Sequence, residues 1–120
     1  MNGEFINLDT AKKIQENKNM DKNLLKIIGH YGILPQLKYF QSGVFELNEA
    51  IINFESDSYN YYDEVYKNNL NHIVEELADV MVMLIQFKEY YHIDGNEIMK
   101  IMREKIDRQL GRIENESKWI

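Results

Sequence analysis

The feature that most constrains the fold is a run of apolar residues at helical spacing near the middle of the chain. Its members lie three or four positions apart: Leu37, Phe40, Val44, Leu47, Ile51 and Phe54. This spacing is typical of one face of an amphipathic helix and predicts a helix over residues 36–55. With 6 glycines and one proline in 120 residues, the chain has few of the turn residues that a many-stranded β protein needs. The sequence therefore predicts an all-α protein.

Before this helix, the sequence predicts an N-terminal extension followed by a short helix. Residues 1–20 are polar, with scattered apolar positions, and are expected to form an extension or a weak helix. Asp21 is a helix-capping residue type, and helical spacing after it stops at Gly29 and Gly32. We therefore expect one domain over residues 21–120.

Two more helices are predicted after a Tyr-rich loop at residues 56–69. The first begins near Asn69 and is apolar on all sides from Val80 to Ile85, so we expect it to be buried on all sides. Residues 92–95 break the pattern, and a last helix runs to about Glu116. These elements predict an antiparallel four-helix bundle-like domain that forms homo-oligomers through its buried helices.

Composition excludes several classes of protein. There is no Cys, and no segment has the layout of a signal peptide, so we expect a cytoplasmic protein. The longest apolar run is far shorter than the ~20 residues that cross a bilayer, so no membrane partner is expected. A net charge of −6 argues against binding to a nucleic-acid polymer, although a small anionic ligand with divalent cations remains compatible.

Two pairs of carboxylates carry the strongest chemical signal. Glu46 and Glu49 share one helix face, and Glu76 and Asp79 repeat the same spacing beside the most apolar segment. Ionised carboxylates next to a buried segment are costly unless a cation or hydrogen bonds compensate them. An all-oxygen set of ligands favours Mg²⁺, with Mn²⁺ as a substitute, and Mg²⁺ is commonly bound together with phosphate.

These acids carry a resemblance to a known family. The segments Glu46-Leu47-Asn48-Glu49 and Glu76-Leu77-Ala78-Asp79 resemble the ExxE and ExxD motifs of the MazG-like all-α nucleotide pyrophosphohydrolases. Further similarity lies in two segments on either side of the motifs: Tyr31-Gly32 with Gln36-Leu37, and the basic stretch from Lys105 to Ile113. The resemblance covers about residues 21–115. One departure is Phe45, which stands where the family often has an additional acid, whereas Glu75 supplies the paired acid of the second motif.

The resemblance implies an all-helical homodimer or homotetramer that uses Mg²⁺ to cleave a nucleoside triphosphate to the monophosphate and pyrophosphate. It also implies that the metal ligands are Glu46, Glu49, Glu76 and Asp79. Among these, we expect Glu46 to orient or deprotonate the attacking water.

Substrate contacts are expected from two other segments. Lys105, Arg108 and Arg112 share a stripe of the last helix, where they either clamp the triphosphate or form a solvated face paired with nearby acids. Gln36 either reaches the base or sugar of the nucleotide or is simply a polar residue at a helix start.

Two alternatives to this activity stay open. The chain is either an enzyme or a non-catalytic helical interaction or regulatory module whose acids pair with the basic stripe. Within the enzyme class, the related phosphoribosyl-ATP pyrophosphohydrolase activity fits the same motifs, and the base preference is not determined. The tyrosines of residues 56–69 either stack on a nucleobase as a lid or pack on their own domain.

Overall fold

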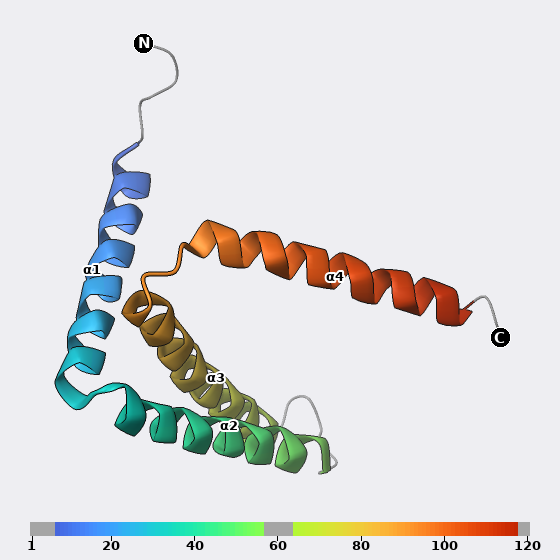
Figure 1. Cartoon of the computed structure of the whole chain (residues 1–120). Coiled ribbons are helices and arrows are strands. Elements are labelled where there is room, and N and C mark those ends of the chain that lie inside the picture. The colour runs from blue at the N-terminus through green and yellow to red at the C-terminus, as the bar shows by residue number, and fades with distance from the viewer. Residues whose placement is uncertain (1–6, 57–63, 118–120) are drawn as a thin grey trace. The chain divides into compact units, whose positions relative to one another are not determined.

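The computed structural model describes residues 7–56 and 64–117, which form four α-helices and no strand (Figure 1). The helices are α1 (Leu8–Tyr31), α2 (Ile33–Ser56), α3 (Glu64–Tyr90) and α4 (Gly95–Ser117). The predicted all-α, bundle-like fold is confirmed. The chain divides into two compact units, one holding α1, α2 and α3 and the other holding α4.

Helix α1 begins earlier than the sequence indicates. Asn7 caps it by accepting a hydrogen bond from the Thr10 backbone N–H at 2.8 Å, and Asp9 lies in the first turn, where a negative charge stabilises a helix. No Pro or Gly follows until Gly29, so nothing interrupts the helix. Residues 8–20, expected as an extension or a weak helix, therefore continue directly into the predicted helix from Asp21. All of residues 8–20 are exposed.

A glycine ends α1 as the sequence predicts. Gly32 has φ +92°, a conformation that side-chain-bearing residues rarely adopt, and its N–H donates to the Ile28 carbonyl at 2.8 Å. Helix α2 begins immediately afterwards, three residues before the predicted start at Gln36, because Pro35 is compatible with the first turn of a helix.

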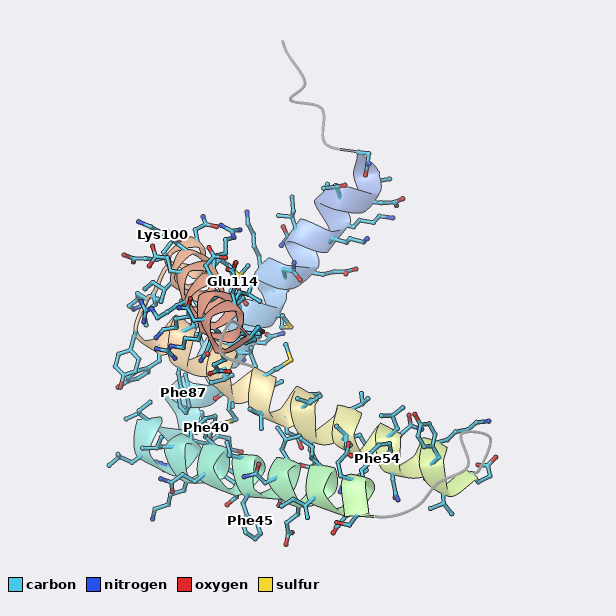
Figure 2. All side chains as sticks on the ribbon, turned by 90° about the vertical axis from the view of Figure 1, so that its right-hand side faces the viewer. Phe40, Phe45, Phe54, Phe87, Lys100 and Glu114 are labelled. Carbon is cyan, nitrogen blue, oxygen red and sulfur yellow. The ribbon has the colours of Figure 1, made fainter. Side chains whose placement is uncertain are left out.

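Helices α2 and α3 pack against each other in antiparallel order. Gln36 hydrogen-bonds with Gln86, and Phe40 makes an edge-to-face contact with Phe87 at 5.4 Å between ring centroids (Figure 2). At the other end of the pair, Phe54 lies 5.3 Å from Tyr66. Partners early in α2 thus lie late in α3, which defines the antiparallel arrangement.

The core of the three-helix unit is small. Helices α1, α2 and α3 contact one another, and the buried apolar side chains of the described residues are Leu24, Ile28, Ala50 and Met83. The segment Val80 to Ile85 was expected to be buried on all sides, but only Met83 within it is buried, and Met81 is 57% exposed. A single copy of the unit therefore leaves much of this apolar segment uncovered.

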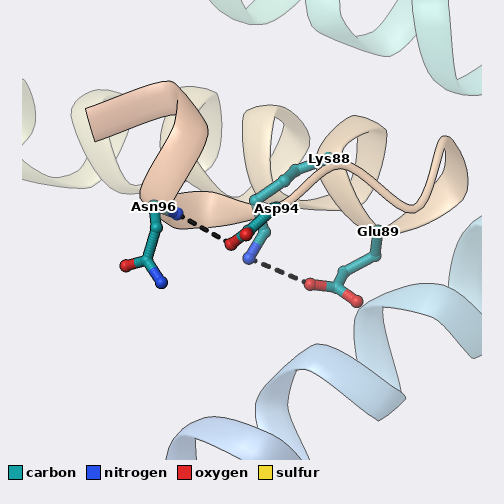
Figure 3. A network of polar contacts seen from close by, with 4 residues as sticks. All are labelled: Lys88, Glu89, Asp94 and Asn96. Atoms are coloured by element: carbon teal, nitrogen blue, oxygen red, sulfur yellow. Dashed lines mark hydrogen bonds and ion pairs between the residues drawn. The ribbon is translucent and has the colours of Figure 1, made fainter. Parts of the chain in front are cut away.

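The predicted break between the last two helices lies at residues 91–94. His92 has φ +53°, and the Asp94 side chain accepts a hydrogen bond from the Asn96 N–H at 2.9 Å, which caps α4 (Figure 3). Just before the break, Lys88 and Glu89 form an ion pair at 3.1 Å. Helix α3 begins at Glu64, so the predicted loop at residues 56–69 is shorter than expected; its residues 57–63 lie outside the described part of the chain. None of the helices in the described ranges is long and apolar enough to cross a membrane.

Candidate functional site

Two carboxyl groups, Glu46 on α2 and Glu76 on α3, lie close enough to interact electrostatically. Glu76 lies on α3 with its side chain only 12% exposed, and the Glu46 carboxyl group on α2 lies close enough for its charge to act on that of Glu76. The Glu76 Oε2 atom is buried and has no hydrogen-bond partner among the described residues. Asp79 follows one helical turn later, close enough for its charge to act on Glu76. The structure thus brings three of the four predicted ligands into one electrostatic environment.

This environment raises the pKa of Glu76 above the ordinary value of 4.5. Burial is the largest cause, because it disfavours the charged carboxylate, and the negative charges of Glu46 and Asp79 add to it. The His72 ring acts in the opposite direction, with its Nδ1 atom 3.9 Å from the Glu76 Oε1 atom. A buried carboxylate surrounded by like charge is the kind of group that a proton or a metal cation stabilises.

A cavity of about 680 Å³ lies beside this carboxyl pair. It is open to solvent and is formed mainly by one face of α2 and one face of α3. Its lining consists of Tyr31, Gln36, Tyr39, Ser42, Gly43, Glu46, Asp79, Val82 and Met83. Glu46 and Asp79, two of the predicted metal ligands, therefore line one cavity. Gln36, which was predicted to contact the base or sugar, lines the same cavity.

The acidic part of this cavity and its amide part lie at different positions along α2. Gln36 and Glu46 are ten positions apart on one helix, which corresponds to about 15 Å at 1.5 Å per residue. Tyr31 and Tyr39, both largely exposed, lie on the cavity together with Gln36. The cavity therefore has carboxyl groups at one end and aromatic and amide groups at the other.

Among the lining residues, Tyr31 and Tyr39 were not assigned a role in the site from the sequence. Tyr31 was quoted only in the segment Tyr31-Gly32 that resembles the family, and Tyr39 was not used. A signal for Tyr39 was present, because Tyr39, Ser42 and Glu46 follow one another at spacings of three and four and so share a face of α2. Tyr31 lies on α1, so spacing along α2 could not place it on the cavity, which it reaches through packing.

The other predicted site residues lie elsewhere. Glu49 is exposed, one turn beyond Glu46 on α2, and is not among the described residues that line the cavity. Lys105, Arg108 and Arg112 lie on α4, share one stripe of that helix as predicted, and are exposed. Their role toward a triphosphate stays a prediction.

Phe45 replaces the acid that the resembling family often has before Glu46. Its side chain points away from α3 in Figure 2 and is 62% exposed. An acid at this position would therefore project about 100° around α2 from Glu46, on an exposed part of the helix. Phe45 leaves Glu46 itself, and its place beside Glu76, unchanged.

The carboxyl groups fit a hard cation in their chemistry. The orphaned Glu76 oxygen, beside Glu46 and Asp79, is an oxygen donor that lacks a partner, as expected for a ligand of Mg²⁺. No three or more His, Cys, Asp or Glu side chains in the described ranges are already grouped closely enough to hold a metal ion. A cation at this place therefore requires the side chains of the exposed residues Glu46 and Asp79 to move toward Glu76.

Part of the predicted tyrosine lid lies outside the described residues, namely Tyr59, Tyr61 and Tyr62. Tyr66, the last member of the set, lies in α3 and packs on Phe54. For Tyr66, this contact corresponds to packing on its own domain.

Comparisons of the chain with family models, with curated proteins and with solved structures find no match. The resemblance to the MazG-like family thus rests on the two acidic motifs and the segments around them.

Proposed function

We propose that this protein is a Mg²⁺-dependent enzyme that hydrolyses a nucleoside or deoxynucleoside triphosphate to the monophosphate and pyrophosphate. The observation that carries the proposal is the buried, partnerless oxygen of Glu76, held beside Glu46 and Asp79 at the edge of an open cavity. Such a carboxylate gains most from a hard cation, and Mg²⁺ commonly binds proteins through a few carboxylates and a substrate phosphate.

In this proposal, Glu46, Glu49, Glu76 and Asp79 hold the ion, with Mn²⁺ as a substitute. A bound Mg²⁺ supplies positive charge that offsets the charge of the phosphates. Glu46 lines the cavity and is exposed, so it can accept a proton from a water molecule there. Attack of that water at the α-phosphorus forms one P–O bond and breaks the bond to the bridging oxygen, which leaves with pyrophosphate. Lys105, Arg108 and Arg112 would neutralise the triphosphate.

The dimensions of the cavity support a nucleotide as the ligand. About 15 Å separates the backbone positions of Gln36 and Glu46, which is in the range of an extended nucleoside triphosphate. With the phosphates at Glu46, Gln36 and the two tyrosines would lie near the base or sugar. The phosphoribosyl-ATP pyrophosphohydrolase reaction fits this arrangement as well and belongs in the same substrate panel.

The proposed enzyme is a homodimer or homotetramer in the cytoplasm. The apolar residues of α3 that a single copy leaves exposed support the oligomer, because monomeric proteins seldom expose such surfaces. A nucleic-acid polymer is not a proposed partner, given the net charge of −6.

The direct test is release of pyrophosphate from a panel of nucleoside triphosphates with Mg²⁺ or Mn²⁺. We expect turnover of at least one nucleotide and none after chelation. Glu46→Gln, Glu76→Gln and Asp79→Asn should each reduce turnover by more than the ~10–100-fold that loss of an outer-shell partner of a metal typically costs. Glu55→Gln, an exposed acid on α2 outside the cavity lining, is the matched control and should keep full activity. Activity that survives chelation, or release of inorganic phosphate alone, would contradict the proposal.

The rival function, a non-catalytic interaction module, is separated by ligand-dependent stability. A specific ligand stabilises the folded state by mass action, by about 2.7 kcal/mol at a concentration of 100 times Kd. We expect Mg²⁺ with a non-hydrolysable nucleoside triphosphate to raise Tm. A module whose acids form ion pairs with the basic stripe should show no such rise.

A further inference from the structure

A buried pair of amide side chains crosses the α2–α3 interface at the end of the cavity away from the acids. Gln36 is 5% exposed and Gln86 is 2% exposed, and the Gln36 Nε2 atom donates to the Gln86 Oε1 atom at 2.8 Å. Buried polar groups are costly unless they are hydrogen-bonded, so a pair of amides inside a small apolar core requires a reason. Gln86 was not singled out from the sequence.

The two amides differ in their access to ligand. Gln36 lines the cavity, whereas Gln86 is not among the described residues of its lining. The bond to Gln86 uses one of the two N–H groups of Gln36, which leaves the Gln36 carbonyl oxygen and second N–H for other partners. Together, these groups form an adjacent acceptor and donor, the pattern that pairs with the edge of a nucleobase.

The bond also determines which way the Gln36 amide is turned. A free carboxamide exchanges its oxygen and nitrogen positions by rotation about its last side-chain bond. With the Gln86 oxygen turned to Gln36, the nitrogen of Gln36 faces Gln86, and reversal of the Gln36 amide alone would bring two acceptor oxygens together, so the bond opposes that reversal. A fixed order of donor and acceptor distinguishes bases, whereas a freely rotating amide accepts several of them.

We propose that Gln86 is a positioning residue, which holds the Gln36 carboxamide in one orientation so that Gln36 selects the nucleobase by its hydrogen-bonding edge. The inference rests on the proposed function, in that the ligand of the cavity is a nucleotide with its phosphates near Glu46. Tyr31 and Tyr39, which lie on the same cavity, give the base an aromatic surface. Gln86 acts through Gln36 and touches no substrate.

The test compares base selectivity in binding, so that it does not depend on turnover. The probes are the α,β-methylene triphosphates of adenosine, cytidine, guanosine and uridine with Mg²⁺, and calorimetry gives Kd for each. The variants are Gln86→Met, which keeps side-chain length but removes the acceptor, and Gln86→Glu, in which a carboxyl oxygen can still accept from Gln36. Gln36→Met and the double variant complete a double-mutant cycle.

We expect the ratio of Kd between the weakest and tightest base to fall about 10-fold in Gln86→Met, the effect of losing one well-placed hydrogen bond. Gln86→Glu should keep the ratio of the parent. In the Gln36→Met background, Gln86→Met should change the ratio no further, because its effect passes through Gln36. The cycle stays informative if Gln86→Met folds poorly, since Gln86→Glu and Gln36→Met still predict a retained and a lost ratio.

Several results would overturn the inference. A parent that binds all four analogues equally, or none of them, shows no base selection for Gln86 to support. A Gln86→Met variant that weakens all four equally, with the ratio unchanged, would show a purely structural role. The pyrophosphate assay judges the reaction independently: selectivity that depends on Gln86 without any pyrophosphate release keeps the inference about recognition and removes the proposed reaction.

Discussion

At the scale of single residues, Glu76 differs from the other acids of the two motifs because its side chain is largely buried. Burial and the charges of Glu46 and Asp79 raise its pKa, and its buried oxygen has no partner in the described part of the chain. Glu49, the second acid of the ExxE motif on α2, is exposed and is not among the described residues that line the cavity. The four acids of the ExxE and ExxD motifs are therefore not equivalent in the structure.

The raised pKa of Glu76 predicts how stability depends on pH in the absence of metal. Below the ordinary pKa of 4.5, Glu76 is protonated in both the folded and unfolded states and contributes no difference. As pH rises from this ordinary pKa toward the raised pKa of the folded state, the folded protein holds a proton that the unfolded chain has lost, so the free energy of unfolding falls. The penalty is complete above the raised pKa. We expect Glu76→Gln to unfold at a higher Tm than the parent in chelator at pH 8, with the difference vanishing near pH 4.

Two controls accompany this measurement of Tm. Glu55→Gln, an exposed acid on the same unit, should follow the parent at every pH. Added Mg²⁺ should narrow the gap between Glu76→Gln and the parent, because the cation offsets the charge of the parent's carboxylate. A Glu76→Gln variant that is less stable than the parent at pH 8 in chelator would indicate a cationic partner for Glu76, as the interaction-module alternative requires.

At the scale of helices, the boundary between α1 and α2 depends on one backbone conformation. Gly32 has φ +92° and ψ 159°, a region essentially restricted to glycine, whereas Gly29 lies inside α1 with no atom within 4 Å of an added Cβ. Gly32→Ala should therefore cost about 1–3 kcal/mol in the free energy of unfolding. Gly29→Ala should be neutral or stabilise by up to about 1 kcal/mol. Urea unfolding of the two variants measures both, and an equal effect at the two positions would contradict the assignment of the helix boundary.

Sequence periodicity predicts these helices well because their signals are local. The apolar stripe from Leu37 to Phe54 identifies α2, and Gly32 marks its boundary with α1. The early start of α1 at Leu8 was not predicted as a definite helix, since its capping residue Asn7 precedes a polar stretch without an apolar face. Which residues meet across α2 and α3 was beyond the sequence.

The candidate site shows the same division between local and long-range information. The motif spacing predicts that Glu46 and Glu49 share a helix, but it does not show that Glu46 lies beside Glu76 while Glu49 is absent from the cavity lining. The register between the two helices determines those contacts. Register also pairs Gln36 with Gln86, 50 positions away, and packing places Tyr31 from α1 on the cavity of α2 and α3. The spacing of residues along one helix predicts neither the Gln36–Gln86 pair nor the position of Tyr31.

At the scale of the whole molecule, the exposed apolar side chains of α3 predict self-association. Val74, Leu77, Met81 and Leu84 recur at spacings of three and four and are each at least 42% exposed, a stripe that resembles a helix-packing surface. We expect a dimer or tetramer by sedimentation equilibrium at micromolar concentration. Met81→Glu should shift the mass toward the monomer, because burying a charge in an apolar interface is costly.

The matched control for this substitution is Asn68→Glu, which adds the same single negative charge at an exposed polar position of α3. It should leave the mass unchanged. A parent protein that sediments as a monomer would contradict the proposed oligomer.

The exposed first half of α1 gives the molecule an uneven distribution of stability. Asp21 is the first residue of this helix that is shielded from solvent, so the turns before it lack tertiary support. Short helical stretches without such support are marginal in water. Amide hydrogens of residues 8–20 therefore exchange with solvent through fraying from the Asn7 end, whereas those around Ile28, whose side chain is completely buried, exchange only when the three-helix unit opens.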